Sequence, residues 1–502
     1  MLRSLLPLLA CGAPAALAQT HVDVTPPAGG QKTLSVDPHD PLHLVVSGLE
    51  VFESFDGGVS WSIIGSYGTT ARARFDANGD LLLWRRARPT SQPGALQRRT
   101  AAGFVDLPVP ALVGVPHDES ISSIVPHPAR ADVLAVHLAG YDDYGGVSDR
   151  IFATVDDGGT WELVTSHYNF SDSYSGTFPF GFVPSPSGGV GRLACVSFWE
   201  DLENSVSSLV SWAPGEAGPR LEVDCPDFAD CTMTGARSLP GQWYGSIDYG
   251  FVPGGSPSGT VLRRPPGGDW ASVGSLGRFD RVAAGNVDPN LIVAVRGEFG
   301  PDPVVDVSRD GGATWSRLID TVGLGLHASN AEVVLTRHDE YVYVVLRDGP
   351  PDGDRILRAE LEATLGAVEC PGVANATGRP GELRAVGLSA ASGNRVLLSL
   401  RDLPPGLCYL PLVSRDAGFT ANPGGSAGNL CLAGTIGRAL DLAALSTDWG
   451  DGFAELDLAR LPAGGVTAAA LPGETWRFQV WYRDCAALGA SNLTNSVAVT
   501  FN

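Results

Sequence analysis

The sequence predicts an all-β protein built from short strands and many turns. Gly contributes 63 and Pro 37 of the 502 residues, and no convincing long amphipathic helical pattern is found. The segment "SRDGGATW" (308–315) is the third copy of nearly the same eight residues, after "SFDGGVSW" (54–61) and "TVDDGGTW" (154–161). Repetition of this kind indicates a fold that uses one structural unit several times.

The first residues, "MLRSLLPLLACGAPAALAQT", have the pattern of an export signal. Arg3 supplies the positive charge, an apolar stretch follows, and "ALA" before Gln19 is a small-x-small cleavage site. We expect residues 1–18 to be removed and the mature chain to be secreted or held in the cell envelope. The run "LLAC" allows an alternative in which Cys11 becomes the lipidated N-terminus of a lipoprotein.

Charge and hydropathy narrow the choice of partners. The formal net charge is −21, which argues against nucleic acid and anionic membrane surfaces. No apolar run after the signal is long enough to span a membrane. A glycan or an extracellular protein therefore remains as the expected partner.

The spacing of the three repeats predicts how many units the chain contains. Asp56, Asp156 and Asp310 are 100 and 154 residues apart. A four-stranded unit takes about 40–50 residues, so the gaps hold two and three units. Weaker copies in the gaps and after the third box bring the total to seven. Seven units suit a closed ring, which leaves no exposed sheet edges at its centre. We expect a seven-bladed β-propeller over residues 19–365, with "HVDVTPP" (21–27) adding a strand to the last blade.

The repeated octapeptide resembles the Asp-box, or BNR repeat, of sialidase-type β-propellers, and the resemblance covers about two thirds of the chain. In that family the box lies at the periphery of the propeller, away from the ligand pocket. The resemblance thus implies that the boxes stabilise turns and take no part in catalysis. The box residues are Ser54, Asp56, Gly58, Trp61, Thr154, Asp156, Gly158, Trp161, Ser308, Asp310, Gly312 and Trp315.

The chemistry of the box agrees with a structural role. A Ser or Thr hydroxyl and an Asp carboxylate can accept backbone N–H groups of a tight turn. The Gly can adopt a positive φ where a side chain would clash. The Trp can fold back and bury a large apolar surface against the sheet.

Residues 366–502 contain no box, and their alternating short strands and turns predict a small β-sandwich. The phrases "GNLCLAGTIGR" and "GETWRFQVWYRD" resemble a C-terminal module that recurs on exported bacterial proteins. That resemblance implies location and fold but no activity.

Two function classes remain open. The first is a noncatalytic exported propeller that binds a ligand. The second is a glycoside hydrolase, sialidase-like or other, with a diverged active site. A sialidase needs three arginines that bind the sugar carboxylate, and the motif that carries the first of them, (F/Y)-R-I-P, is missing. The noncatalytic class is therefore favoured, and no catalytic residue, cofactor or metal site is assigned. Acidic loops such as "CPDFADC" (225–231) could hold calcium, but their spacing matches no known calcium motif.

The cysteines predict disulfides, because an exported chain folds in an oxidising compartment. Cys225 and Cys231 close a short loop and are expected to be bridged. Four cysteines of the C-terminal segment are also expected to pair, with the connectivity left open. They are Cys370, Cys408, Cys431 and Cys485.

A ligand site is expected where the loops between successive blades converge. Two aromatic-rich segments, 166–182 and 238–251, are assigned to such loops. Flat rings with a polar edge suit sugar faces. The candidate ligand-binding residues are Tyr168, Tyr174, Trp243 and Tyr244, all expected to be exposed.

Overall fold

The computed structural model describes most of the chain after the N-terminal segment. The described residues are 21–502 without 28–29, 31, 68–70, 86–94, 101, 111–119, 142–146, 170–173, 184–191, 201–204, 225–228, 236–241, 250–258, 275–278, 298–302, 349–352, 362, 388–395, 448 and 485–490. Within this part no helix is long and apolar enough to cross a membrane.

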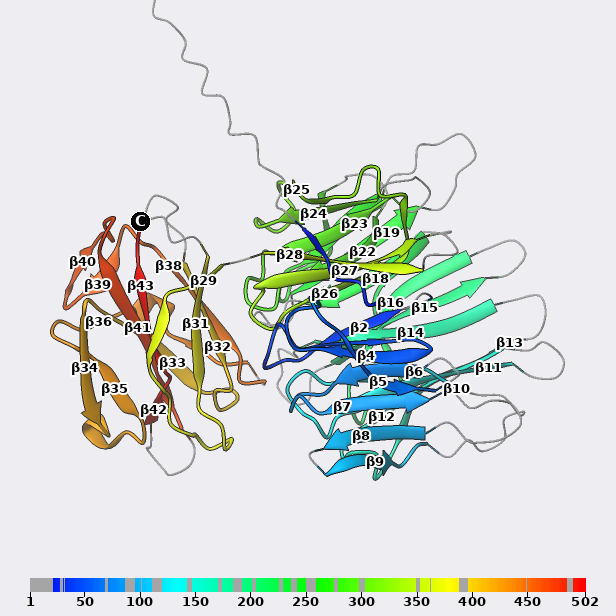
Figure 1. Ribbon diagram of the computed structural model, residues 1–502, viewed down its shortest axis with the longest axis horizontal. Coiled ribbons are helices and arrows are strands. Elements are labelled where there is room, and N and C mark those ends of the chain that lie inside the picture. The colour runs from blue at the N-terminus through cyan, green and yellow to red at the C-terminus, as the bar shows by residue number, and fades with distance from the viewer. Residues whose placement is uncertain are drawn as a thin grey trace, which may run out of the picture.

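Seven four-stranded antiparallel sheets follow one another in the described chain between Val22 and Glu360, and we number them as blades 1 to 7 in the order of their first strands (Figure 1). Blade 1 contains β2 (Thr33–Val36), β3 (Leu44–Ser47), β4 (Glu50–Ser54) and β5 (Ser62–Ser66). Blade 2 contains β6 (Ala71–Phe75), β7 (Leu81–Arg85), β8 (Ala95–Thr100) and β9 (Gly103–Leu107). Blade 3 contains β10 (Ser120–Pro126), β11 (Leu134–Tyr141), β12 (Val147–Thr154) and β13 (Glu162–Asn169). Blade 4 contains β14 (Tyr174–Val183), β15 (Arg192–Glu200), β16 (Ser205–Trp212) and β17 (Arg220–Asp224). Blade 5 contains β18 (Ala229–Gly235), β19 (Trp243–Tyr249), β20 (Gly259–Arg264) and β21 (Ala271–Gly274). Blade 6 contains β22 (Phe279–Ala284), β23 (Ile292–Arg296), β24 (Val304–Ser308) and β25 (Ser316–Asp320). Blade 7 contains β26 (Leu326–Leu335), β27 (Tyr341–Asp348) and β28 (Asp354–Glu360), and β1 (Val22–Asp23) is its fourth strand.

The sheets form a closed ring around their first strands. Each first strand contacts the first strand of the next blade, and β26 of blade 7 contacts β2 of blade 1. The all-β class and the propeller architecture expected from the sequence are therefore confirmed.

The N-terminal strand β1 closes the ring by completing blade 7. Val22 lies opposite Arg358 and Asp23 opposite Leu357 of β28, in antiparallel register. The backbone N–H of Val24 continues the pairing and donates to the Ile356 carbonyl at 2.9 Å. The strand expected from "HVDVTPP" is thus present in the expected blade.

Sequence patterns of the strands follow their position in a blade. The second strands β3 and β7 are nearly continuous apolar runs, "LVVS" and "LLLWR", because neighbouring blades cover both of their faces. The outer strand β9 is exposed along most of its length. Buried clusters connect neighbouring blades, as where Tyr343 of blade 7 packs with Leu44 and Phe52 of blade 1.

The remaining strands form a two-sheet sandwich. One sheet has the order β29-β31-β32-β38 and the other β30-β43-β41-β33-β36, with β37 on β33 and β42 on β41. The bounds are β29 (Ala363–Leu365), β30 (Ala367–Cys370), β31 (Glu382–Gly387), β32 (Val396–Arg401), β33 (Cys408–Ser414), β34 (Asp416–Ala421), β35 (Asn429–Ala433), β36 (Gly437–Arg438), β37 (Ala444–Leu445), β38 (Gly452–Leu456), β39 (Leu461–Ala463), β40 (Val466–Ala468), β41 (Thr475–Arg483), β42 (Ser491–Leu493) and β43 (Ser496–Thr500). Two short 3-10 helices, η2 (Pro423–Gly425) and η3 (Leu440–Leu442), connect some of them. Between the sheets lies one continuous apolar core that includes Trp476, Phe478 and Phe501.

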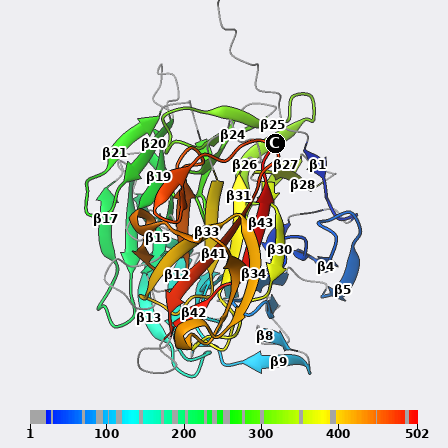
Figure 2. The same ribbon diagram turned by 90° about the vertical axis from the view of Figure 1, so that its left-hand side faces the viewer.

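The sandwich lies against one face of the ring, and Figure 2 shows the outer strands β5, β9, β17 and β21 around it. It meets the turns between the first and second strands of the blades, which we call the first turns. His39 of blade 1, His127 of blade 3 and His338 of blade 7 all contact sandwich residues. This face is therefore covered in the intact chain.

Candidate functional site

The structure does not bring the four predicted ligand-binding residues together. Trp243 has 4 % of its surface exposed and Tyr244 has 0 %. The Tyr244 hydroxyl donates to the Pro289 carbonyl at 2.7 Å, and its ring packs with Val282 and Ile292 of blade 6. The expected exposure of Trp243 and Tyr244 is wrong, because both rings are buried, and the Tyr244 ring packs between blades 5 and 6.

The error lies in the position of the segment within its blade. Trp243 begins β19, the second strand of blade 5, and lies opposite Gly235 at the end of β18, the first strand. It therefore lies where the first strand of a blade passes into the second, whereas the prediction needed a connection between two blades. Second strands are apolar because both faces are covered, and large rings are suited to that position.

Tyr168 and Tyr174 do lie where two blades connect. Tyr168 is near the end of β13 in blade 3, and Tyr174 begins β14 in blade 4. Residues 170–173 and the two Tyr side chains lie outside the described part of the chain. The backbone therefore places both residues at the end of the ring opposite to the sandwich.

The three box turns share one hydrogen-bond pattern. In the first box the Ser54 hydroxyl donates to Asp56 Oδ1 at 2.8 Å and accepts the Gly58 N–H at 2.8 Å. Asp56 also accepts the N–H and the hydroxyl of Ser60, at 2.9 and 2.6 Å. Equivalent bonds connect Thr154, Asp156, Gly158 and Thr160 in the second box, and Ser308, Asp310, Gly312 and Thr314 in the third. In each box both carboxylate oxygens thus accept hydrogen bonds from residues of the same turn.

The Trp and Gly residues of the boxes fit the same turn. The indole N–H of Trp61 donates to the Val24 carbonyl at 3.1 Å, and that of Trp161 donates to Pro108 at 3.2 Å. Trp315 donates to Gly312 within its own box at 2.9 Å. The Gly two residues after each box Asp has a positive φ: 88° at Gly58, 85° at Gly158 and 100° at Gly312.

Several buried or half-buried carboxylates of the described chain form ion pairs with arginine side chains. Burial of Glu53 opposes its ionisation, but hydrogen bonds from His43 and Arg99 lower the pKa of this carboxyl to about 2, which opposes its use as a proton donor near neutral pH. The pairs include Glu53 with Arg99, Glu222 with Arg264, Asp306 with Arg296, Glu332 with Arg74, Glu340 and Glu382 with Arg384, and Asp402 with Arg337.

Two described carboxyl groups have a raised pKa, and both occupy first turns. Burial raises the pKa of Asp339 to about 7 and also raises the pKa of Asp76. Asp339 is 1 % exposed and accepts the backbone N–H groups of Asn286 and Val287, each at 2.8 Å. A substrate cannot reach this carboxyl group, which instead connects the first turns of blades 6 and 7.

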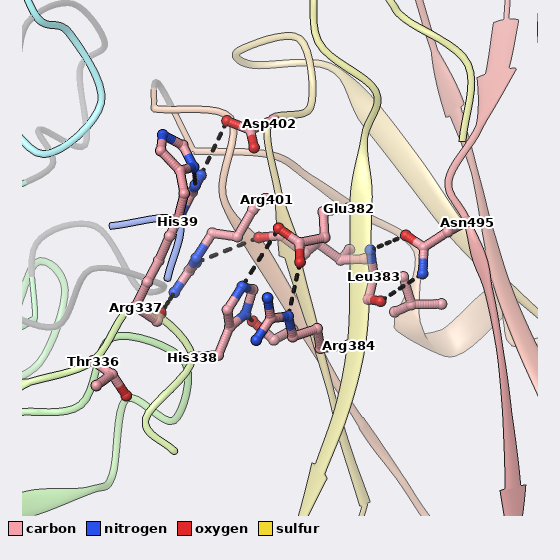
Figure 3. Close-up of polar contacts among 12 residues, drawn as sticks. His39, Thr336, Arg337, His338, Glu382, Leu383, Arg384, Arg401, Asp402 and Asn495 are labelled. Carbon is pink, nitrogen blue, oxygen red and sulfur yellow. Dashed lines mark hydrogen bonds and ion pairs between the residues drawn. The ribbon is translucent and has the colours of Figure 1, made fainter. Parts of the chain in front are cut away.

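A polar cluster connects blades 6 and 7 to the sandwich (Figure 3). Arg401 of β32 is completely buried and donates to the carbonyl groups of Asn286 at 3.1 Å and Arg337 at 2.5 Å. Its charge is balanced by the buried carboxylate of Asp451 at 3.4 Å. Arg337 in turn donates to Asp402 at 3.0 Å. One sandwich arginine therefore satisfies the carbonyls of two blade turns.

His338 lies beside this cluster and is uncharged near neutral pH. Burial lowers its pKa to about 4, and its ring is hydrogen-bonded to the Ser399 hydroxyl at 2.8 Å. Glu382 lies 3.6 Å from the other ring nitrogen. Burial opposes ionisation of Glu382, but His338 and Arg384 keep the pKa of this carboxyl well below its usual range. The arrangement is a polar contact between two domains, and no signal in the sequence predicted it.

One of the expected disulfides is present. Cys370 of β30 is bonded to Cys431 of β35, with Cα atoms 6.2 Å apart. Cys408 is a free thiol, so the expectation that all four C-terminal cysteines pair is wrong for this residue. Cys225 and Cys485 lie outside the described residues, as does the Cys231 side chain. Cys195 is a buried free thiol, as the apolar run around it suggests. No group of three His, Cys, Asp or Glu that could hold a metal ion occurs in the described part.

The chain is similar at low identity to several solved structures. No family model matches the chain, and no curated protein does. Among solved structures, YCF48 bound to D1 peptide is 16 % identical over 70 % of this chain and 98 % of its own, with a TM-score of 0.41. An oligogalacturonate lyase in complex with manganese is 12 % identical over 69 % and 97 %, with a TM-score of 0.47. The GH74 xyloglucanase from Xanthomonas campestris is 14 % identical over 95 % and 81 %, with a TM-score of 0.42.

Proposed function

We propose that the mature chain is an exported, noncatalytic β-propeller protein that binds a glycan or an extracellular protein. The observation that carries this proposal is the state of the described carboxyl groups. Glu53, Glu332 and Glu340 form ion pairs with arginine, and Asp339 is enclosed in turns beneath the sandwich. A glycosidase needs one accessible carboxylic acid and a second carboxylate across the scissile bond.

The ligand would bind on the face opposite to the sandwich. The sandwich occupies the first turns, and the connections between blades lie at the other end of the ring. Tyr168 and Tyr174 flank one such connection. Aromatic rings at this position would provide flat apolar surface with a polar edge for a sugar or a peptide.

A glycan array probed with the purified mature chain, combined with hydrolysis assays on the same glycans, tests the proposal. We expect saturable binding without release of reducing sugar, and binding that weakens in the double variant Tyr168→Ala/Tyr174→Ala. Phe104→Ala is the matched control, because Phe104 is 41 % exposed on the outer strand β9. Hydrolysis that survives purification to homogeneity would support the glycoside hydrolase alternative.

Export is a separate part of the proposal and has its own measurement. N-terminal sequencing of the protein from its native envelope or medium should begin at Gln19. A blocked N-terminus with a lipid-modified Cys11 would instead identify a lipoprotein. In that case Cys11→Ala should release the protein from the membrane fraction.

A further inference from the structure

An open groove of about 910 Å³ crosses the sandwich where the edges of its two sheets meet. It lies between β38, the terminal strand of one sheet, and β36, the terminal strand of the other. The hairpin of β39 and β40 and the helix η3 form its other walls. Figure 1 shows β36, β39 and β40 on the side of the sandwich that faces away from the propeller. The groove is therefore accessible in the intact chain.

Side chains of both charges line the groove without neutralising one another. Arg438 and Arg460 are exposed, and neither forms an ion pair with a carboxylate within the described residues. Asp441 and Asp457 are exposed on the same walls. Elsewhere in the described chain, arginines commonly pair with a carboxylate, as Arg401 does with Asp451. Asp457 Oδ1 accepts the backbone N–H of Ala459 at 3.0 Å, but neither Asp457 nor Asp441 forms an ion pair within the described residues, so both carboxylates can pair with a cationic partner.

Apolar surface accompanies these charges. Leu440 is 70 % exposed and Val466 is 68 % exposed, on opposite walls. Leu456 and Leu461, at the floor, belong to the core of the sandwich. Covering Leu440 and Val466 with apolar groups of a partner would remove this surface from water, at about 25 cal/mol per Å².

The shape favours an extended backbone as the occupant. A terminal strand offers main-chain groups that an added strand can pair with. At the hairpin tip a Cβ built on Gly464 would lie 2.1 Å from Thr435 Cγ2, whereas one built on Gly465 would meet no atom within 4 Å. The tip therefore leaves room for another chain on the side of Gly465.

We infer that this groove binds an extended peptide segment of another protein, one that carries basic side chains between aliphatic ones. Aliphatic side chains would cover Leu440 and Val466, and basic side chains would pair with Asp441 and Asp457. The net charge of −21 attracts a cationic segment from a distance. No aromatic ring is among the residues that line the described groove, so the stacking surface that sugars prefer is missing.

Selection from a random peptide library displayed on phage, with the full mature chain as bait, tests the inference. The enriched peptides are synthesised, and their dissociation constants are measured by fluorescence anisotropy. We expect sequences in which Lys or Arg alternates with aliphatic residues. The charge-reversing variant Asp441→Arg/Asp457→Arg should weaken their binding about tenfold or more.

Two further variants make the result specific to the groove. Asp269→Arg/Glu360→Arg makes the same change in net charge at exposed positions on the propeller and should change the affinity less than twofold. Leu440→Ser/Val466→Ser alters only exposed side chains, so it should keep the melting temperature while it weakens binding. Failure to enrich any peptide, enrichment of acidic peptides, or equal binding to the groove variants would overturn the inference. The ligand proposed above binds the propeller, so Tyr168→Ala/Tyr174→Ala should not affect these peptides.

Discussion

The propeller and the sandwich differ in how their buried apolar residues are divided into clusters. In the propeller the buried residues form several clusters, and one cluster joins two neighbouring blades, as Val45 and Val51 of blade 1 join Phe75 of blade 2. In the sandwich one large cluster extends from Leu365 to Phe501, and a much smaller one contains Leu412, Leu432 and Leu493. Damage in the propeller should therefore stay between two blades, whereas damage in the sandwich should affect the whole domain.

The largest expected effect compares one Phe from each domain. Phe478 is 0 % exposed in the sandwich and Phe75 is 5 % exposed in the propeller. We expect Phe478→Ala and Phe75→Ala each to lower the free energy of unfolding by about 3–5 kcal/mol. Hydrogen exchange should then show faster exchange throughout the sandwich in Phe478→Ala, but only in blades 1 and 2 in Phe75→Ala. Uniform faster exchange across the propeller in Phe75→Ala would contradict the comparison.

A somewhat smaller effect is expected at the contact between the domains. Arg401→Ala leaves the Asp451 carboxylate buried without its ion pair and removes donors from two blade turns. We expect a loss of about 3 kcal/mol and two separate transitions in calorimetry where the wild type has one. Arg130→Ala is the control, since the ion pair of Arg130 with Asp132 is exposed and should contribute less than about 1 kcal/mol. A single transition in Arg401→Ala would show that the domains are held together by other contacts.

The box turns provide the next prediction. Asp310→Ala removes the acceptor of the Thr314 N–H and hydroxyl and of the Ser308 hydroxyl. The melting curve should show destabilisation by roughly 1–3 kcal/mol, because these donors lose their partner. The dissociation constant for the ligand should be unchanged at temperatures where the variant is fully folded. Loss of binding or of an activity at an unchanged melting temperature would instead indicate a functional role for the box.

The smallest effect concerns pH and lies within blade 1. Burial of His43 opposes its charge, but hydrogen bonds to Asp37 at 2.8 Å and Glu53 at 2.9 Å raise its pKa to about 9. Because the folded pKa lies above the unfolded value, this stabilisation is complete below about pH 6.5 and is lost as pH rises through 9. Denaturant titrations should show a loss of about 1 kcal/mol between pH 7 and pH 10. His43→Gln should flatten this part of the profile, and an unchanged slope would exclude His43 as its source.

The remaining cysteines give a prediction without an energy. Cys408 is a half-buried free thiol, whereas Cys370 is bonded to Cys431. Alkylation of the unfolded, non-reduced protein should therefore label Cys408, and peptide mapping should find the Cys370–Cys431 pair. A Cys408 that resists alkylation without prior reduction would contradict this assignment.

The sequence predicted the parts of the fold that rest on local signals. The boxes at Asp56, Asp156 and Asp310 mark the same turn in three blades because each turn is stabilised by its own residues. Blade 5 has no box, so nothing local distinguished its first turn from a loop between blades, and Trp243 was placed on the wrong face. The contacts between the domains join positions such as Arg401 and Asn286, 115 residues apart, which no periodicity connects.

The closing strand β1 sets an order of events during folding. Val22 precedes every other strand of the propeller along the chain, yet its partner Arg358 follows 336 residues later. Pairing over such a separation has a large cost in chain entropy and is slow. The strand must therefore wait, unpaired, while the blades assemble, and it can complete the ring only after the last blade has been made. The first strand of the propeller in the sequence is thereby the last one to find its place in a sheet.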